Sequence, residues 1–256
     1  MPTPESLELS VVVPVYNEEE SIALLLDEIG QALQGLCQYE VIIVDDGSTD
    51  RTAERVLASA RRGPAPIRLV RHAGNAGQSA ALVSGVRHAR GIWVATLDGD
   101  AQNDPADLPD LLDAARDPED GADLVAGIRA QRADDWVKRV SSRVANRVRR
   151  RLLDDGVSDT GCGLKVFRRD LFLGLPRFGH MHRFLPALAL RAEARVKTRP
   201  VSHRPRRGGT SKYGVGNRLW VGIIDLFGVM WLQRRPCNPE AFEEHPQSSS
   251  KPSKSI

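Results

Sequence analysis

The chain has 256 residues, of which 41% are hydrophobic and 27% are charged. This length and balance suit one globular domain with short appendages, and they exclude collagen-like, wholly disordered and polytopic membrane proteins. Three cysteines without a paired or Cys/His metal-ligand spacing argue against a disulfide framework or a zinc site and favour a reducing cytosol. No signal peptide is expected, because the first residues lack a basic region and run directly into a strand pattern.

The net charge of +3 hides a segregation of positive residues. Residues 129–151 hold nine Arg and Lys against two Asp, and residues 191–218 hold nine against Glu193 alone. Such clusters occur on nucleic-acid-binding surfaces, on membrane-surface patches, in cradles for phosphate-bearing substrates and on ordinary solvated helix faces. No known nucleic-acid-binding motif appears, so a nucleic-acid partner is not expected.

Apolar runs alternate with helical patterns through the first half of the chain. The expected strands are Leu9–Val15, Glu40–Asp45, Ile67–Arg71, Gly91–Leu97 and Asp123–Gly127. The expected helices are Glu18–Leu36, Thr49–Ala60, Gly77–Ala89 and Ala106–Arg116. Strands that are apolar throughout and alternate with helices predict an α/β fold, doubly wound, with helices on both faces of a mainly parallel sheet.

Two amphipathic segments follow in the second half. Valines recur at steps of three or four between Val137 and Leu152, with Arg and Lys between them, which predicts a basic helix. This helix either packs on the core with a charged outer face or lies near a membrane surface or an acidic ligand.

The second segment is an apolar run of 14 residues, 219–232, interrupted only by Asp225. As a helix it would extend about 21 Å, short of the roughly 30 Å hydrocarbon core. Tryptophans near both ends and flanking arginines resemble interfacial anchoring, and a buried core or dimer helix is the alternative. The predicted organisation is a catalytic domain over 1–218, an apolar interfacial helix over 219–235 and a disordered polar tail over 236–256.

Polar residues gather where three of the expected strands end. Asn17-Glu18 follows the first strand, Asp45-Asp46 closes the second, and Asp98-Gly99-Asp100 follows the fourth. Ligands of such sheets bind beyond the carboxyl ends of the strands, so these groups should meet at one edge. Asp98 and Asp100, with Gln102 after them, offer oxygen ligands suited to Mg²⁺ or Mn²⁺ with substrate phosphates.

With these motifs in order, the chain resembles the inverting family 2 glycosyltransferases of GT-A fold, and more narrowly the polyprenyl-phosphate, dolichol-phosphate mannose synthase-like enzymes. The resemblance covers about residues 7–232. It rests on VVVPVYNEEE (11–20), VIIVDDGSTDRT (41–52), HAGNAGQSAALVSGVRHARG (72–91), LDGDAQNDP (97–105), VAGIRAQR (125–132), SDTGCGLKVFRRD (158–170) and HRPRRGGTSKYG (203–214).

The resemblance implies roles for individual residues. Those matching the nucleotide-sugar pocket are Pro14, Tyr16, Asn17, Glu18, Asp45, Asp46, Gly77, Asp98, Gly99 and Lys212. Those matching the metal and diphosphate motif are Asp98, Asp100 and Gln102. Those matching the acceptor-phosphate site are Arg129, Arg139 and Ser142. Asp100, Arg206, Arg129 and Arg139 are the expected catalytic residues, with Arg206 on a loop near the diphosphate.

The implied reaction transfers a hexose, with inversion, from a nucleotide-diphosphate sugar (GDP-mannose or a UDP-sugar) to undecaprenyl or dolichyl phosphate. The acceptor phosphate is already ionised near neutral pH, so no dedicated general base is expected. No pair of C-terminal transmembrane helices is evident, which favours peripheral attachment to the cytoplasmic face of a membrane; an oligomer stays open. The alternatives are a family 2 enzyme with a saccharide or protein acceptor, a nucleotidyltransferase, which normally has a Gly-rich triphosphate loop that this chain lacks, and a catalytically silent nucleotide-sugar-binding module.

Overall fold

The structure is a computed structural model that describes residues 7–63, 66–129, 153, 156–157, 159–205 and 216–235, with side chains of the last stretch described from residue 222 onward. The expected basic helix Val137–Leu152 and the tail from Pro236 lie outside these residues. So do four of the expected site residues, namely Arg139, Ser142, Arg206 and Lys212.

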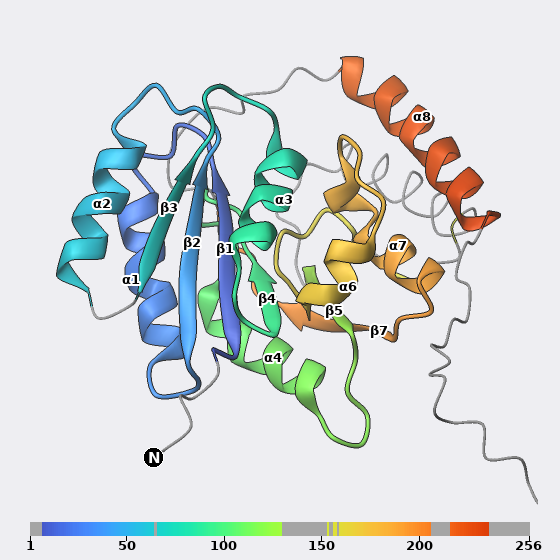
Figure 1. The fold of residues 1–256 in the computed structure, drawn as a ribbon, viewed down its shortest axis with the longest axis horizontal. Helices are drawn as coiled ribbons and strands as arrows, with labels where there is room; N and C mark the ends of the chain where they lie inside the picture. The colour runs from blue at the N-terminus through green and yellow to red at the C-terminus, as the bar shows by residue number, and fades with distance from the viewer. Residues whose placement is uncertain are drawn as a thin grey trace, which may run out of the picture.

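Seven strands form one sheet in the order β3-β2-β1-β4-β6-β5-β7 (Figure 1). Their bounds are β1 Leu9–Val15, β2 Tyr39–Asp45, β3 Ile67–Arg71, β4 Trp93–Thr96, β5 Leu124–Arg129, β6 Lys165–Arg168 and β7 Val196–Val201. β1, β2, β3 and β4 run parallel, and β5 pairs in parallel with β7. Only β6, among the described strands, runs antiparallel to its neighbours β4 and β5. The expected α/β fold with a mainly parallel sheet is therefore confirmed.

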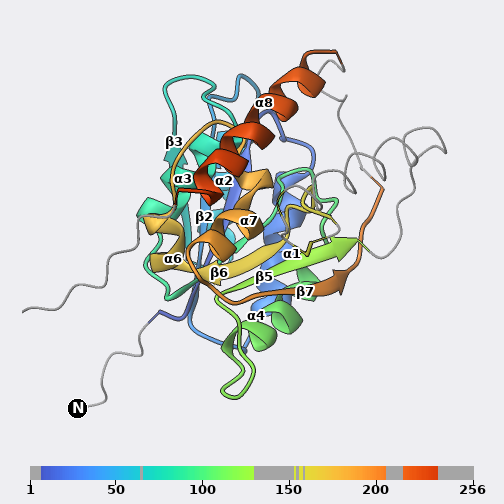
Figure 2. The same ribbon diagram turned by 90° about the vertical axis from the view of Figure 1, so that its right-hand side faces the viewer.

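Helices cover both faces of the sheet (Figures 1 and 2). Their bounds are α1 Ile22–Leu33, α2 Thr52–Arg62, α3 Gln78–His88, the 3₁₀ turn η1 Pro105–Asp107, α4 Leu108–Arg116, α6 Arg169–Gly174, the 3₁₀ turn η2 Met181–Arg183, α7 Leu185–Arg191 and α8 Gly216–Gln233. α1, α2 and α4 contribute to one core cluster, and α3, α6, α7 and α8 contribute to the other. The two clusters make a three-layer domain with helix–sheet packing on each side.

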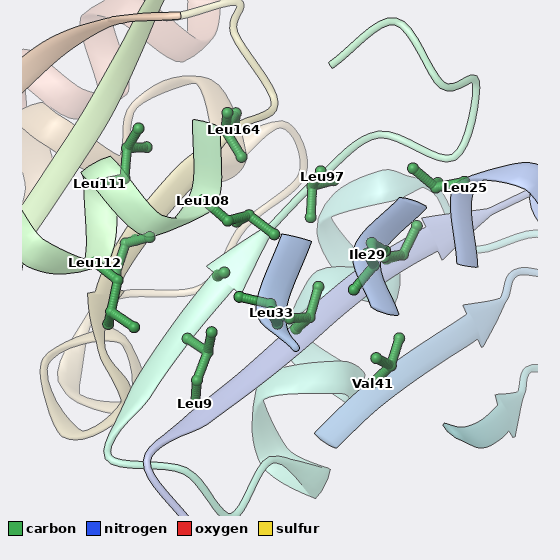
Figure 3. Packing of buried hydrophobic residues seen from close by; sticks show 14 of the residues in the cluster. Leu9, Leu25, Ile29, Leu33, Val41, Leu97, Leu108, Leu111, Leu112 and Leu164 are labelled. Atoms are coloured by element: carbon green, nitrogen blue, oxygen red, sulfur yellow. The ribbon is translucent and has the colours of Figure 1, made fainter. Parts of the chain in front are cut away.

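The first cluster shows why α1 forms where it does. Leu25, Ile29 and Leu33 recur at helical spacing, are almost fully buried, and lie against Leu9 and Val41 of the sheet (Figure 3). Burial of such side chains stabilises each by about 1.5–3 kcal/mol relative to exposure. The helix begins four residues later than the expected start at Glu18, because the intervening residues bond to the loop after β2 instead.

The chain leaves β1 toward β2 and β3 on one side, whereas β4 lies on the other side of β1. The order of the strands thus reverses between β1 and β4, and doubly wound sheets bind their ligands at such a point. The loops at the carboxyl ends of these strands therefore frame the candidate site.

The opposite edge of the sheet is held by a buried acid. Glu40, 3% exposed, accepts hydrogen bonds from Ser10 Oγ at 2.9 Å and from the Arg90 backbone N–H at 2.8 Å. Its second oxygen pairs with Arg68 at 2.8 Å. This network joins β1, β2, β3 and the turn before β4, and it lies away from the candidate site.

α8 contains the apolar run singled out in the sequence. It packs on α7, and its Val229 is fully buried in the second core cluster. Across the described part of the chain, no helix combines the length and apolar character needed to cross a membrane.

Candidate functional site

The loops after β1, β2 and β4 meet at one edge of the sheet. Val15 lies opposite Asp45 in the β1–β2 register, and Val12 lies opposite Thr96 in the β1–β4 register. Asn17 and Ala101, in two of these loops, have φ of 53° and 55°. Non-glycine residues seldom adopt this conformation, and such residues concentrate at functional sites.

The β1 and β2 loops are bonded to each other. The Asn17 backbone N–H donates to Ser48 Oγ at 2.9 Å, and Asn17 Oδ1 accepts from the Thr49 N–H at 2.7 Å. The Glu18 N–H donates to Thr52 Oγ1 at 2.8 Å. These bonds explain why Asn17 and Glu18 remain outside α1, at the edge where the sequence places a donor pocket.

Pro14 and Tyr16 lie on either side of the end of β1. The backbone of Pro14 points to the β4 side of the strand, as does that of Val12, whose carbonyl accepts a hydrogen bond from the Leu97 N–H. The pairing of β1 with β4 ends at Val12 and Thr96, so a residue that lacks an N–H is tolerated at position 14 of this central strand. The space beside it is taken by Gly99: a Cβ there would lie 2.7 Å from Val15 Cγ1 and 3.1 Å from the Pro14 carbonyl oxygen.

The Asp45 side chain is fully buried, and its two oxygens accept from the Ser48 N–H at 2.8 Å and from Arg71 Nε at 3.1 Å. These internal hydrogen bonds support the turn after β2. Contact between Asp45 and the donor stays a prediction.

Asp46 holds the loop that precedes α3. Its oxygens accept from the backbone N–H groups of Ala76 at 2.9 Å and Gly77 at 2.8 Å, and His72 Nδ1 lies 2.7 Å away. The other ring nitrogen of His72 is 2.8 Å from Ser84 Oγ of α3. Gly77 itself has φ of 90°, so the predicted nucleotide residues Asp46 and Gly77 are parts of one clamp that sets the N-terminus of α3.

Asp98 lies at the centre of the edge. Its Oδ1 accepts from Gln78 Nε2, at the start of α3, at 2.7 Å. Burial raises the pKa of Asp98 to about 6, and the neighbouring Asp100 carboxylate adds to the rise; Lys165, Arg129 and the Gln78 bond act in the opposite direction. Lys165, Arg129 and Gln78 thus offset only part of the cost of holding a charged Asp98 carboxylate at this buried position.

The segment before β6 forms a wall against Asp98. A Cβ on Gly163 would lie 2.2 Å from Asp98 Oδ2, so any larger residue there would displace the Asp98 carboxylate. The Gly163 carbonyl accepts from Thr96 Oγ1 at 2.7 Å, which fixes the wall to β4. Lys165 is 3% exposed, its Nζ donates to the Cys162 carbonyl, and burial lowers its pKa.

Asp98 and Asp100 fit a divalent cation that is shared with phosphate oxygens. No cluster of three or more His, Cys, Asp or Glu side chains suited to a metal occurs within the described residues. Mg²⁺-type ions in nucleotide enzymes commonly take one or two carboxylates plus phosphate and water, which matches two carboxylates at one strand end. The raised pKa of Asp98 beside Asp100 supports this fit, since a cation would relieve the repulsion.

Gln102 contacts Asp100 through its backbone, whereas its side chain is hydrogen-bonded elsewhere. Its backbone N–H donates to Asp100 Oδ1 at 3.2 Å, and its side-chain Nε2 lies 3.4 Å from the Arg204 carbonyl. Its own carbonyl accepts from the Arg204 N–H at 2.9 Å. A metal-ligand role for Gln102 stays a prediction, and in this structure the residue joins the Asp98–Asp100 loop to the segment after β7.

Arg204 reinforces that junction. Its guanidinium contacts Asp104 at 2.6 Å and Glu28 of α1 at 2.8 Å. Arg204 precedes Arg206 by two residues in the sequence. The segment that leads to the expected loop arginine is therefore anchored, at Arg204, to the loop that contains Asp98 and Asp100.

Arg129 ends β5 and is paired within the protein. Its Nε and Nη2 donate to the two oxygens of Asp159 at 2.6 and 2.8 Å. The bidentate pair fixes the guanidinium plane and leaves Nη1 outside the pair. The acceptor-phosphate role of Arg129 remains a prediction, and Asp159 is the partner that orients it.

His182 is a further residue that the sequence did not single out. Ser79 Oγ accepts from the His182 backbone N–H at 3.4 Å and lies 2.8 Å from its Nδ1, which makes the hydroxyl the donor to Nδ1. Burial lowers the pKa of His182 to about 3, with nearby Lys165 and Arg183 adding to the effect. η2 therefore contacts α3 through a neutral imidazole, one residue from Gln78.

Comparisons with known proteins agree with this geometry. The model of the family described as "Glycosyl transferase family 2" matches residues 10–174. The chain belongs to this family. A dodecaprenyl-phosphate galacturonate synthase from Rhizobium johnstonii is 37% identical over 242 residues, which cover 93% of this chain and 71% of that protein. This glycosyltransferase chain is also 38% identical, over 208 residues, to an undecaprenyl-phosphate 4-deoxy-4-formamido-L-arabinose transferase from Edwardsiella ictaluri; the match covers 81% of this chain and 63% of that protein.

Solved structures share the fold. A glucosyl-3-phosphoglycerate synthase from Mycobacterium tuberculosis, in complex with Mn²⁺, uridine diphosphate and phosphoglyceric acid, superposes with a TM-score of 0.68 at 22% identity. The alignment covers 88% of this chain and 78% of that one. At this identity the likeness shows the GT-A fold.

Proposed function

We propose that this glycosyltransferase transfers a sugar, with inversion, from a nucleotide-diphosphate sugar to a polyprenyl phosphate. The observation that carries the proposal is the pair of similar relatives: their names share a polyprenyl-phosphate acceptor and differ in the sugar. The chain spans less than two thirds of the second relative's length, so the acceptor belongs to the proposal.

Asp98 and Asp100 are the residues proposed to hold Mg²⁺ or Mn²⁺ at the donor diphosphate. When bound, the ion supplies Lewis-acid stabilisation of the leaving nucleoside diphosphate. Gln78 and Gly163 fix the Asp98 carboxylate, by a 2.7 Å hydrogen bond and by steric contact respectively. The Asp46 clamp fixes the loop before α3 against the β2 loop, so the donor edge is set before substrate arrives.

The acceptor phosphate is proposed to meet the cationic residues. Arg129 is oriented by Asp159, and Arg139 and Ser142 join it at the acceptor phosphate from the sequence alone. Arg206 and Lys212 are proposed, likewise from the sequence, for the donor diphosphate and the nucleotide-sugar pocket. Arginine forks suit phosphate oxygens and offset the repulsion between two anionic substrates. Since the acceptor is itself an ionised nucleophile, its positioning replaces deprotonation by a general base.

A bilayer surface is the proposed site of the reaction, on the cytoplasmic face. On α8, Ile224, Phe227 and Trp231 are 67%, 61% and 60% exposed. They recur at steps of three and four, so they form one apolar stripe, and Arg234 and Arg235 follow it. An aromatic-containing apolar stripe with adjacent cations is typical of helices that lie in the interface.

A donor screen tests the proposal. Purified protein is incubated with Mn²⁺ or Mg²⁺, undecaprenyl phosphate in vesicles and GDP- or UDP-sugars in turn, and lipid-linked sugar is measured. We expect one donor class to give a lipid product. Sugar transfer to a saccharide or protein hydroxyl without any lipid product would replace the acceptor, and donor binding without turnover would indicate a silent binding module.

A further inference from the structure

α8 presents two opposite faces. Asp225, Val229 and Gln233 follow one another at steps of four and face the protein, and Val229 is completely buried. The side chain of Asp225 is 18% exposed, although this residue is the only charge in the apolar run. With about 100° of rotation per residue, the outward stripe of Ile224, Phe227 and Trp231 lies on the far side of the helix from Asp225 and Val229.

Four hydrogen bonds tie α8 to the rest of the domain. Asp225 Oδ2 lies 3.0 Å from His180 Nδ1, and Gln233 Nε2 donates to the Leu153 carbonyl at 2.8 Å. Arg191 of α7 donates from Nε to the Leu232 carbonyl at 2.7 Å and from Nη2 to the Arg235 carbonyl at 2.9 Å. The Leu232 carbonyl also accepts from the Arg235 N–H at 3.1 Å, so Arg191 adds a second donor there and gives the Arg235 carbonyl, beyond the end of the helix, a partner.

These contacts add directional precision to apolar packing. Burial of Val229, with Leu226, Met230 and Leu232 packed against the same cluster, turns this face of α8 toward the domain, but apolar contacts tolerate small rotations. Hydrogen bonds and ion pairs depend on angle and distance. Ties at the middle and at the end of α8 therefore select one rotation, in which the stripe points outward (Figures 1 and 2 show α8 on the outer surface beside α7).

The middle tie is close to the catalytic edge. His180 immediately precedes η2 and has φ of 62°, which holds its side chain in a tight left-handed turn. Two residues later, His182 contacts Ser79 of α3 at 2.8 Å. The residue before Ser79 is Gln78, which bonds Asp98 at 2.7 Å. Asp225 is thus joined to the metal-binding edge through one loop and the first turn of one helix.

We propose that Asp225 and His180 are positioning residues for the delivery of the lipid acceptor. Their contact fixes the rotation of α8, so that docking of the stripe on a bilayer presents the Asp98–Asp100 edge to a phosphate at the bilayer surface. The inference rests on the proposed function, and it names the residues that orient the membrane-bound protein for sugar transfer. The occupant of the stripe is a lipid bilayer, consistent with the arginines after it and the Arg235 guanidinium 5.9 Å from the Trp231 ring.

The test distinguishes three properties of each variant: membrane binding, sugar transfer as such, and orientation of the bound protein toward the lipid acceptor. Asp225→Ala removes one side of the tie, and His180→Gly removes the other while suiting the left-handed backbone. Each is compared with wild type in three assays: flotation with phosphatidylglycerol-containing vesicles, transfer to a short water-soluble isoprenyl phosphate, and transfer to undecaprenyl phosphate in the same vesicles. Ile224→Ala is the matched control, since it alters the adjacent outward residue.

We expect both tie variants to float with vesicles and to use the short acceptor within about twofold of wild type, while losing about tenfold with the vesicle acceptor. The two losses should not add in the double variant, because each single change breaks the same contact. Asp225→Asn keeps an acceptor for His180 and should recover most of the vesicle activity. Ile224→Ala should instead weaken flotation.

Three outcomes overturn the inference. If the tie variants lost activity equally with both acceptors, Asp225 would be a general structural residue. If they no longer floated with vesicles, Asp225 would contribute to membrane binding itself. If they lost no activity with the vesicle acceptor, Asp225 would have no role in acceptor delivery. A wild-type protein that transfers sugar to another acceptor but to neither isoprenyl phosphate would instead overturn the proposed function. The melting temperature of each variant shows whether a lost activity reflects lost folding.

Discussion

Replacing Gly163 by alanine should displace the Asp98 carboxylate with a single methyl group. The added Cβ would lie 2.2 Å from Oδ2, 2.3 Å from Cγ and 2.5 Å from Oδ1 of Asp98. Such atoms are in favourable contact at about 3.5 Å, so the added methyl group and the Asp98 carboxylate must move apart by about 1 Å.

The Gly163 backbone cannot move freely, because its carbonyl is held by Thr96 Oγ1 at 2.7 Å and the next residue, Leu164, is fully buried. The Asp98 carboxylate is the end of a side chain and is therefore the group that moves, which disturbs its 2.7 Å hydrogen bond from Gln78 Nε2. Overpacking of this kind costs about 1–3 kcal/mol of folding free energy. A catalytic group misplaced by about 1 Å costs about 100-fold in rate, so turnover should suffer more than folding.

The assay compares kcat with saturating Mn²⁺ and donor, alongside thermal unfolding. Gly174→Ala is the matched control, because Gly174 ends α6 with nothing within 4 Å of an added Cβ. We expect the control to match wild type in kcat and Gly163→Ala to fall by about two orders of magnitude. If Gly163→Ala kept kcat within twofold at unchanged melting temperature, the wall against Asp98 would not limit catalysis.

Three further predictions follow from the described contacts. Asp100→Ala should abolish transfer with its circular dichroism unchanged, as excess EDTA should for wild type; near-normal turnover in either case would exclude the metal role. His182, whose pKa is lowered to about 3, should cost stability as pH falls from about 6.5 toward 3, because only the unfolded chain then takes up the proton; denaturation at pH 7 and pH 4 should show a loss of up to about 3 kcal/mol that His182→Gln lacks. Glu40→Gln should lower the free energy of unfolding by about 1–3 kcal/mol through the weakened Arg68 pair, with kcat of the remaining folded enzyme unchanged; an equal fall in kcat would contradict its structural role.

The first half of the fold was predictable because its strands and helices differ sharply in period. β1 and β3 have the expected bounds, and β2 begins one residue earlier. Helix starts were less predictable, as α1 shows. Glu18 and Glu19 suit a first helical turn, yet their backbone N–H groups bond to Thr52 and Asp50 of another loop. Such long-range hydrogen bonds leave no trace in local periodicity.

In the second half of the sheet β5 was expected, but β6 and β7 were missed, for a related reason. β6 has four residues, one of them the buried Lys165, and it runs antiparallel to both neighbours. A run this short with a lysine at its start has no distinct period. Its importance for the site comes from Gly163 and Lys165 in the motif TGCGLK, whose glycine–lysine spacing alone does not predict a wall against Asp98.

The choice between adjacent acids also needed the structure. Asp45 and Asp46 are equivalent as sequence, but Asp45 is the last residue of β2 and turns into the protein toward Ser48 and Arg71. Asp46, one residue later, receives backbone N–H groups from about 30 residues along the chain. The motif therefore indicates the edge, whereas the different hydrogen-bond partners of the two acids appear only in the structure. Donor contact by either acid stays a prediction.

The surroundings of Asp98 favour a divalent cation at this edge. Arg129 is paired with Asp159 through two hydrogen bonds, so among the described residues Lys165 is the main unpaired cation near Asp98, and Asp100 lies beside Asp98. Burial is the larger cause of the raised pKa of Asp98, and the Asp100 charge is the second. Two neighbouring carboxylates would repel a diphosphate, and a divalent cation would offset both the burial and the repulsion. We therefore expect the donor diphosphate to bind to this edge only when a divalent cation is present.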